Sequence, residues 1–215
     1  MALQLQKVQA GQRINLTKEQ VGLTKIRIGL SWDFKAGLTA DLDTSLVVLG
    51  DNGRMLTEES LLFYNSPKNA HGKPHLFNGA LIHTGDERSG LSEGDDETLL
   101  IDLNQIPTDV KCLVAATTIY GAGQFELVTF GRVKNAAVRL YNAATNQALY
   151  QFDLTHDAAK ATSVDMVRFF IKDGDWRFEA LGEIVGKSDN GLQDIVDKYQ
   201  YVPQGNYQDD LKNFI

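Results

Sequence analysis

The chain has 215 residues, of which 43% are hydrophobic and 23% charged, and its formal net charge at pH 7 is −7. This composition is typical of a folded globular domain, and the acidic balance argues against a nucleic-acid partner, which would favour a basic surface. No stretch approaches the roughly 20 apolar residues of a membrane span, and the N-terminus lacks the apolar core of a signal peptide. The single cysteine, Cys112, excludes an internal disulfide, so we expect a cytoplasmic protein.

Short segments in which polar and apolar residues alternate dominate the sequence, and each of them predicts a β-strand. In chain order these segments are residues 2–8, 13–16, 24–32, 44–50, 61–65, 98–103, 111–120, 136–142 and 148–154. In the third segment the apolar side chains recur at every second position, which predicts one buried face made of Ile26, Ile28, Leu30 and Trp32.

The last part of the chain predicts a β-hairpin followed by a helix. Two apolar runs flank the Asp-Gly-Asp sequence at 173–175, and Asp-Gly between apolar runs is a strong hairpin signal. Residues 192–200 carry apolar side chains at helical spacing, and Asp189 or Asn190 can serve as the N-cap.

Many short strands and one late helix favour an all-β fold, an antiparallel β-sandwich of two sheets with a short C-terminal helix. We expect a single domain over residues 1–200 and a C-terminal tail over 201–215, because no Gly/Pro/Ser-rich linker divides the chain. The longest irregular stretch, 65–79, is too rich in turn residues for a regular element, and a loop of that length is more often functional than structural.

The segment HTGDERSGLSEGDDETLLIDL, residues 83–103, concentrates negative charge. Six carboxylates fall between Asp86 and Glu97 against one arginine, with glycines among them. Calcium prefers about six to eight oxygen ligands, in loops whose glycines let backbone carbonyls turn inward. The spacing is not that of an EF-hand, because Arg88, Gly90 and Leu91 occupy positions where the motif needs Asp or Asn, or Gly.

A second pair of carboxylates, Asp41 and Asp43, lies two residues apart on one side of an extended segment, and Asn65 adds a neutral oxygen. We expect all these acids in an exposed, glycine-rich setting, which does not favour the split pKa values of a catalytic carboxylate pair. From the residues alone, metal binding and a solvated acidic loop are both open.

Three further motifs have ordinary interpretations. Residues 182–188, GEIVGKS, have one residue too few between the glycines for a phosphate-binding loop, so turn glycines at a strand end are favoured. The histidines match no zinc spacing and are expected at the surface: His71, His75 and His83. No nucleophile motif is present, and Cys112 is expected to be buried by its apolar neighbours.

Taken in order, ADLDTSLVVLGDNG, FYNS, HTGDERSG, EGDDE, FGRVKNAAVRL and GDWRFEALGEIVGKSDNGLQDIVDKY resemble the TerD family of bacterial tellurite-resistance and stress-response proteins. The resemblance covers residues 3–200 and implies a β-sandwich with no enzymatic activity that binds one or two Ca²⁺ ions in acidic loops. By position it implies these metal ligands: Asp41, Asp43, Asn65, Gly85, Asp86, Glu87, Glu93, Asp95, Asp96 and Glu97, with Gly94 as a further turn position.

The chain departs from the family pattern at two places. Thr39 stands where the family often has Asp, and residues 66–80 are longer than the family's usual connection. The resemblance also implies protein partners in a stress-response assembly, with the inner membrane face as one location, and neither a nucleic-acid partner nor a transmembrane segment. Two other functions stay open: a metal-dependent hydrolase with His83 as its base, and a scaffold in which the metal is purely structural.

Overall fold

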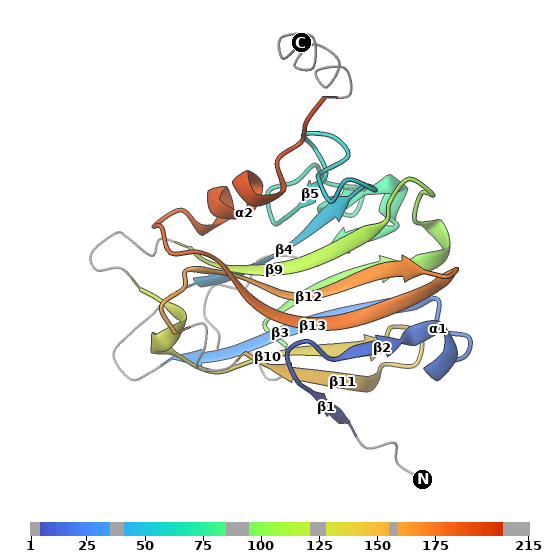
Figure 1. The fold of residues 1–215 in the computed structure, drawn as a ribbon, viewed down its shortest axis with the longest axis horizontal. Helices are drawn as coiled ribbons and strands as arrows, with labels where there is room; N and C mark the ends of the chain where they lie inside the picture. Colours follow the sequence, from blue (N-terminus) through green and yellow to red (C-terminus); the bar gives the residue numbers. More distant parts are fainter. Residues whose placement is uncertain (1–4, 35–40, 85–94, 121–127, 155–158, 204–215) are drawn as a thin grey trace, which may run out of the picture.

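A computed structural model describes residues 5–34, 41–84, 95–120, 128–154 and 159–203, and it consists of two β-sheets packed face to face (Figure 1). Sheet A contains, in spatial order, β1 (Gln6–Val8), β11 (Gln147–Asp153), β10 (Val133–Asn142), β3 (Lys25–Phe34), β8 (Glu97–Asp102), β7 (Leu81–His83) and β6 (His75–Leu76). Sheet B contains β2 (Arg13–Asn15), β13 (Asp175–Gly186), β12 (Ser163–Lys172), β9 (Cys112–Tyr120), β4 (Asp41–Leu49) and β5 (Leu61–Leu62). The predicted two-sheet sandwich is confirmed.

The core forms between the sheets from side chains that alternate along the strands. In β3, the four apolar side chains of the predicted face are each at most 2% exposed: Ile26, Ile28, Leu30 and Trp32. They meet apolar side chains of sheet B such as Leu42, Leu46 and Phe169, which are 0% exposed. The period-two pattern therefore predicted the inward face correctly, because a strand has two faces and only one of them meets the opposite sheet.

Two expectations about the fold need correction. β1 runs parallel to β11, whereas the other strand pairs in the described residues are antiparallel. The stretch 65–79 is not wholly irregular, because it contains β6 and the 3₁₀ turn η1 (Phe77–Gly79). The first feature depends on hydrogen bonds from β1 to a strand that is distant in the sequence, and the second on pairing of β6 with β7 across a tight turn. Local residue patterns do not reveal which strand will be the partner.

Short helical segments complete the fold. They are α1 (Leu16–Glu19), α2 (Gly191–Tyr199) and the 3₁₀ turns η2 (Leu103–Gln105) and η3 (Phe130–Arg132). No helix in the described ranges is long and apolar enough to cross a membrane.

The predicted C-terminal hairpin and helix are both confirmed. β12 and β13 pair around the turn at 173–174, and the Asn190 side chain caps α2 by accepting a hydrogen bond from Gln193 N at 3.2 Å. α2 packs outside sheet B across β9, β12 and β13 (Figure 1). Its buried Ile195 contributes to a second, smaller apolar cluster with Val47, Val114 and Ala116.

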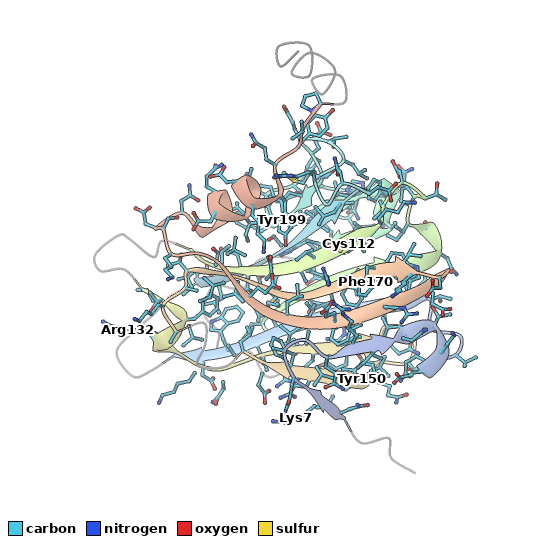
Figure 2. The ribbon with its side chains drawn as sticks, in the orientation of Figure 1. Lys7, Cys112, Arg132, Tyr150, Phe170 and Tyr199 are labelled. Carbon is cyan, nitrogen blue, oxygen red and sulfur yellow. The ribbon has the colours of Figure 1, made fainter. Side chains whose placement is uncertain are left out.

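A buried carboxylate fixes the end of α2 on the sheet. Asp165 of β12 is 0% exposed, and its Oδ2 accepts hydrogen bonds of 2.5 Å from both Lys198 Nζ and Tyr199 Oη. Burial raises the pKa of Asp165, and the two bonds from α2 oppose that rise. Tyr199 lies near Cys112, at the margin of the smaller apolar cluster (Figure 2).

The start of α2 lies so close to sheet B that Gly191→Ala should destabilise the protein. A Cβ on Gly191 would lie 2.8 Å from the backbone oxygen of Thr162 and 3.2 Å from Ser163 Cβ. Backbone atoms cannot move aside without distorting the sheet, so we expect the free energy of unfolding in urea titrations to fall by about 1–3 kcal/mol. This loss outweighs the higher helix propensity of alanine relative to glycine. The exposed α2 variant Asp197→Ala is the control, and equal stability of Gly191→Ala and the parent would contradict the expectation.

Candidate metal site

A buried polar cluster joins the two sheets at the start of β8. Glu97 of β8, Thr44 of β4 and His83 of β7 are each at most 1% exposed. Glu97 Oε2 accepts hydrogen bonds from the backbone N–H of Thr44 and, at 2.8 Å, from Thr44 Oγ1. His83 Nε2 lies 3.3 Å from Thr44 Oγ1 and 3.8 Å from Glu97 Oε2. Thr44 thereby fixes one oxygen of the Glu97 carboxyl group.

The other oxygen of this carboxyl group is available. Glu97 Oε1 is buried and has no hydrogen-bond partner in the part of the chain that the structure describes. Burial raises the pKa of Glu97 to about 9; the hydrogen bonds from Thr44 oppose the rise, and the charges of Asp43 and Asp41 add to it. Without a cation this carboxyl group therefore keeps its proton at neutral pH. A divalent cation could replace that proton, so the donor set fits a hard metal ion such as Ca²⁺.

Three further predicted ligands lie close to this cluster in the fold. Asp41 and Asp43 stand two positions apart on β4, in the extended segment that the sequence predicts, and their charges act on Glu97. Asp96 precedes Glu97, and its Oδ2 accepts a hydrogen bond of 3.0 Å from the backbone N–H of Trp32. The structure thus brings two acids of β4 to the beginning of β8, more than 50 residues away in the sequence.

Asp95 is directed elsewhere. Its Oδ2 lies 2.8 Å from Arg27 Nη1 and its Oδ1 lies 2.9 Å from Arg139 Nη1, and the side chain is only 4% exposed. Arg27 also stacks on Tyr141, with its Cζ 3.6 Å from the ring centroid. The group formed by Arg27, Asp95 and Arg139, here called the arginine clamp, occupies both carboxylate oxygens of Asp95. In this structure Asp95 anchors the start of β8 to β3 and β10.

The remaining predicted ligands are not brought to the cluster by described contacts. Asn65 is exposed in the turn after β5. The predicted ligands Gly85, Asp86, Glu87 and Glu93, with Gly94, lie outside the described residues. In the five described ranges, no group of three or more His, Cys, Asp or Glu side chains is arranged to hold a metal ion. A complete calcium shell would therefore require further oxygens, from backbone carbonyls, water or the acids of residues 85–94.

Two expectations about this site are wrong. Glu97 was expected in an exposed setting and is buried, and His83 was expected at the surface and is 0% exposed. The burial of Glu97 could have been predicted from the sequence. Glu97, Leu99 and Ile101 occupy every second position of β8, so Glu97 lies on the same core-facing side as the two apolar residues. Thr44 is a residue that the sequence interpretation missed, and it shares its inward face with Leu42 and Leu46.

The other motifs have the ordinary roles expected of them. Residues 182–186 belong to β13, where Gly182 adopts a φ of 65° at an irregularity in the pairing with β12. Cys112 is half-buried rather than buried as expected. Its partial burial still raises the pKa of the thiol to about 11, which disfavours the reactive thiolate.

Comparison with known proteins gives one family and several relatives. Residues 1–199 match the family described as TerD domain. The uncharacterized protein YceE of Bacillus subtilis (strain 168) is 36% identical over 185 residues, covering 85% of this chain and 91% of that protein. General stress protein 16U of the same organism is 33% identical, covering 80% and 86%. Tellurium resistance protein TerD of Serratia marcescens is 32% identical, covering 80% and 87%.

Solved structures show the same fold. A homologue of telluride resistance protein (TerD), SCO6318 from Streptomyces coelicolor A3(2), has a TM-score of 0.62 and 18% sequence identity, covering 80% of this chain and 96% of that one. The protein SAV2460, whose function is unknown, has a TM-score of 0.61 and 20% identity, covering 78% and 92%. At these identities the likeness concerns the sandwich architecture.

Proposed function

Because the chain belongs to the TerD family, we propose that it is a calcium-binding stress-response protein that has no enzymatic activity. The observation that carries the calcium proposal is the buried Glu97, whose Oε1 has no partner while the charges of Asp41 and Asp43 act on it. Relatives named as stress and tellurium-resistance proteins support the broader role.

The chain's own residues would hold the ion as follows. Glu97 would supply its unpartnered oxygen from between the sheets. Asp41, Asp43 and Asp96, together with acids of residues 85–94, would supply further carboxylate oxygens to the one or two ions at this end of the sandwich. Thr44 orients the Glu97 carboxyl group, and the surrounding core excludes water from it. Bound Ca²⁺ would supply positive charge that neutralises these acids. We propose that the neutralised end of the sandwich then forms a surface for a protein partner.

Calorimetric titration of metal-free protein with Ca²⁺ tests the proposal. We expect saturable binding, and a ligand at a hundredfold excess over its Kd stabilises the native state by about 2.7 kcal/mol, so the melting temperature should rise. Glu97→Gln and Asp43→Asn should each weaken binding at least tenfold. Asp109→Asn, an exposed substitution with the same charge change, should not.

A proton count makes the test specific to Glu97. Since the pKa of Glu97 is about 9 in the metal-free state, Ca²⁺ binding at pH 7.5 should release close to one proton. Titrations in buffers of different ionisation enthalpy measure that number, and Glu97→Gln should abolish the release. An unchanged melting temperature and no heat at millimolar Ca²⁺ would refute the proposal.

A further inference from the structure

A second feature at the same end of the molecule is a cavity of about 500 Å³ on the outer face of sheet B. It lies between β4, β9, the Phe63–Tyr64 segment and the start of α2. A cavity of this size is larger than a single metal ion needs and falls in the range of small-molecule sites, which is about 300–1,000 Å³.

Among the described residues, the cavity lining carries negative charge. Asp43 and Asp189 both contribute to it, and no Lys, Arg or His side chain of the described ranges lines it. Two carboxylates in one lining favour a cationic ligand and disfavour an anion. The lining also includes Phe63 and Tyr64, whose rings pack edge to face with centroids 5.5 Å apart. Aromatic rings attract cations and cover apolar chains, so they suit an organic cation better than a hydrated ion.

A buried hydroxyl group gives an independent indication of a ligand. Ser45 lines the cavity and is 2% exposed, yet its Oγ has no hydrogen-bond partner within the described residues. Asp43, Ser45 and Val47 stand at every second position of β4, so their side chains lie on the same face of the sheet. This is the outer face, because Val47 packs under α2. A buried hydroxyl without a partner costs free energy, and a donor from a ligand would remove that cost.

The start of α2 does not favour an anion here. Asn190 caps the helix through Gln193 N, and Asp194 lies in its first turn. The Asp194 carboxylate also accepts a hydrogen bond of 2.8 Å from Ser188 Oγ. The partial positive charge of the helix terminus is therefore already compensated by side chains of this chain.

We propose that this cavity binds a small organic cation, an alkylammonium compound with a short apolar chain. Its ammonium group donates hydrogen bonds to the Asp43 and Asp189 carboxylates and to Ser45 Oγ, and its methylene groups contact Phe63 and Tyr64. The site shares Asp43 with the proposed calcium site and differs from it in Ser45, Tyr64 and Asp189, which are not among the predicted metal ligands. The two ligands would therefore compete for Asp43, and binding of the cation is measured without Ca²⁺.

Three ligands with the same five-carbon chain test the charge preference. We titrate the full chain in EGTA with 1,5-diaminopentane, 1,5-pentanediol and glutarate, and measure heat by calorimetry. The diamine should bind with one-to-one stoichiometry, and the diol and the dianion should bind at least tenfold more weakly. Equal binding of the diol and the diamine would overturn the proposal. So would the absence of saturable diamine binding at concentrations up to about 10 mM, which is near the weak end of specific recognition.

Variants locate the binding and separate it from calcium. Asp189→Asn should weaken diamine binding about tenfold or more, because a charge-assisted hydrogen bond is lost, and Tyr64→Leu should weaken it through the aromatic wall. Asp109→Asn is the matched control and should bind like the parent. Asp189→Asn should retain Ca²⁺ binding, and Glu97→Gln should retain diamine binding in EGTA, so either proposal can fail alone. Equal effects of Asp189→Asn and Asp109→Asn would refute the assignment to this cavity.

Discussion

Raising the pH from 5 to 8 should lower the free energy of unfolding of the metal-free protein, and Glu97→Gln should remove about 4 kcal/mol of that change. The pKa of Glu97 is raised from 4.5 to about 9 in the native state, chiefly by burial. Between these two values the native state holds a proton that the unfolded state has released. Stability is therefore highest below pH 4.5 for this group and is lost as the pH rises toward 9.

Urea denaturation in EGTA at several pH values measures this dependence. Asp165 also has a raised pKa, so some slope should persist in Glu97→Gln, and the difference between the two proteins isolates Glu97. Carboxyl groups with lowered pKa values, such as Asp102 and Asp153, titrate below this window. Saturating Ca²⁺ should flatten the slope of the parent, because the ion binds the deprotonated form. The same slope in the parent and in Glu97→Gln would show that Glu97 is ionised without metal.

Gly29→Ala should destabilise the protein by about 1–3 kcal/mol through the arginine clamp. A Cβ on Gly29 would overlap the Asp95 carboxylate, which lies directly against the β3 backbone at that position. Displacing the carboxylate breaks its ion pairs with Arg27 and Arg139, at 2.8 and 2.9 Å. Since Asp95 precedes Asp96 and Glu97, the same change should weaken Ca²⁺ binding without touching a carboxylate of the cluster.

A double-mutant cycle shows whether the overlap with Asp95 is the cause. Asp95→Ala removes the carboxylate and leaves room for a methyl group at position 29. Gly29→Ala should therefore cost much less in the Asp95→Ala background than in the parent, by chemical denaturation. Equal costs in both backgrounds would place the effect in the strand itself and contradict the role of the clamp.

The sequence predicted the fold well wherever one face of a strand meets the core. The Ile26 to Trp32 pattern, the hairpin at 173–175 and the cap at Asn190 all follow from local rules, and each is confirmed. The parallel pairing of β1 with β11 was not predictable in that way, since the partners are separated by more than 130 residues and a three-residue strand carries little pattern of its own.

The residue types of the candidate metal site were predictable from the sequence, but the directions in which the side chains point were not. The acidic segment before β8 was evident, yet two acids only two positions apart point to different places. Asp95 contacts two arginines outside sheet A, and Glu97 enters the core. Arg27 and Arg139 carry no local signal that they lie beside Asp95, because only the pairing of β3 with β8 and β10 brings them together. Calcium binding itself stays a prediction.

The outermost strands of both sheets are very short, with two or three residues each in β1, β6, β2 and β5. An exposed strand edge is a template on which another chain can add a strand, and a longer edge offers more unpaired backbone groups to that chain. The long strands β3, β9, β10 and β12 lie between other strands of the described sheets, whereas β4 and β13 pair with their outer neighbours over only two and three residues. At its outermost strands the sandwich therefore offers only a short template for edge-to-edge aggregation.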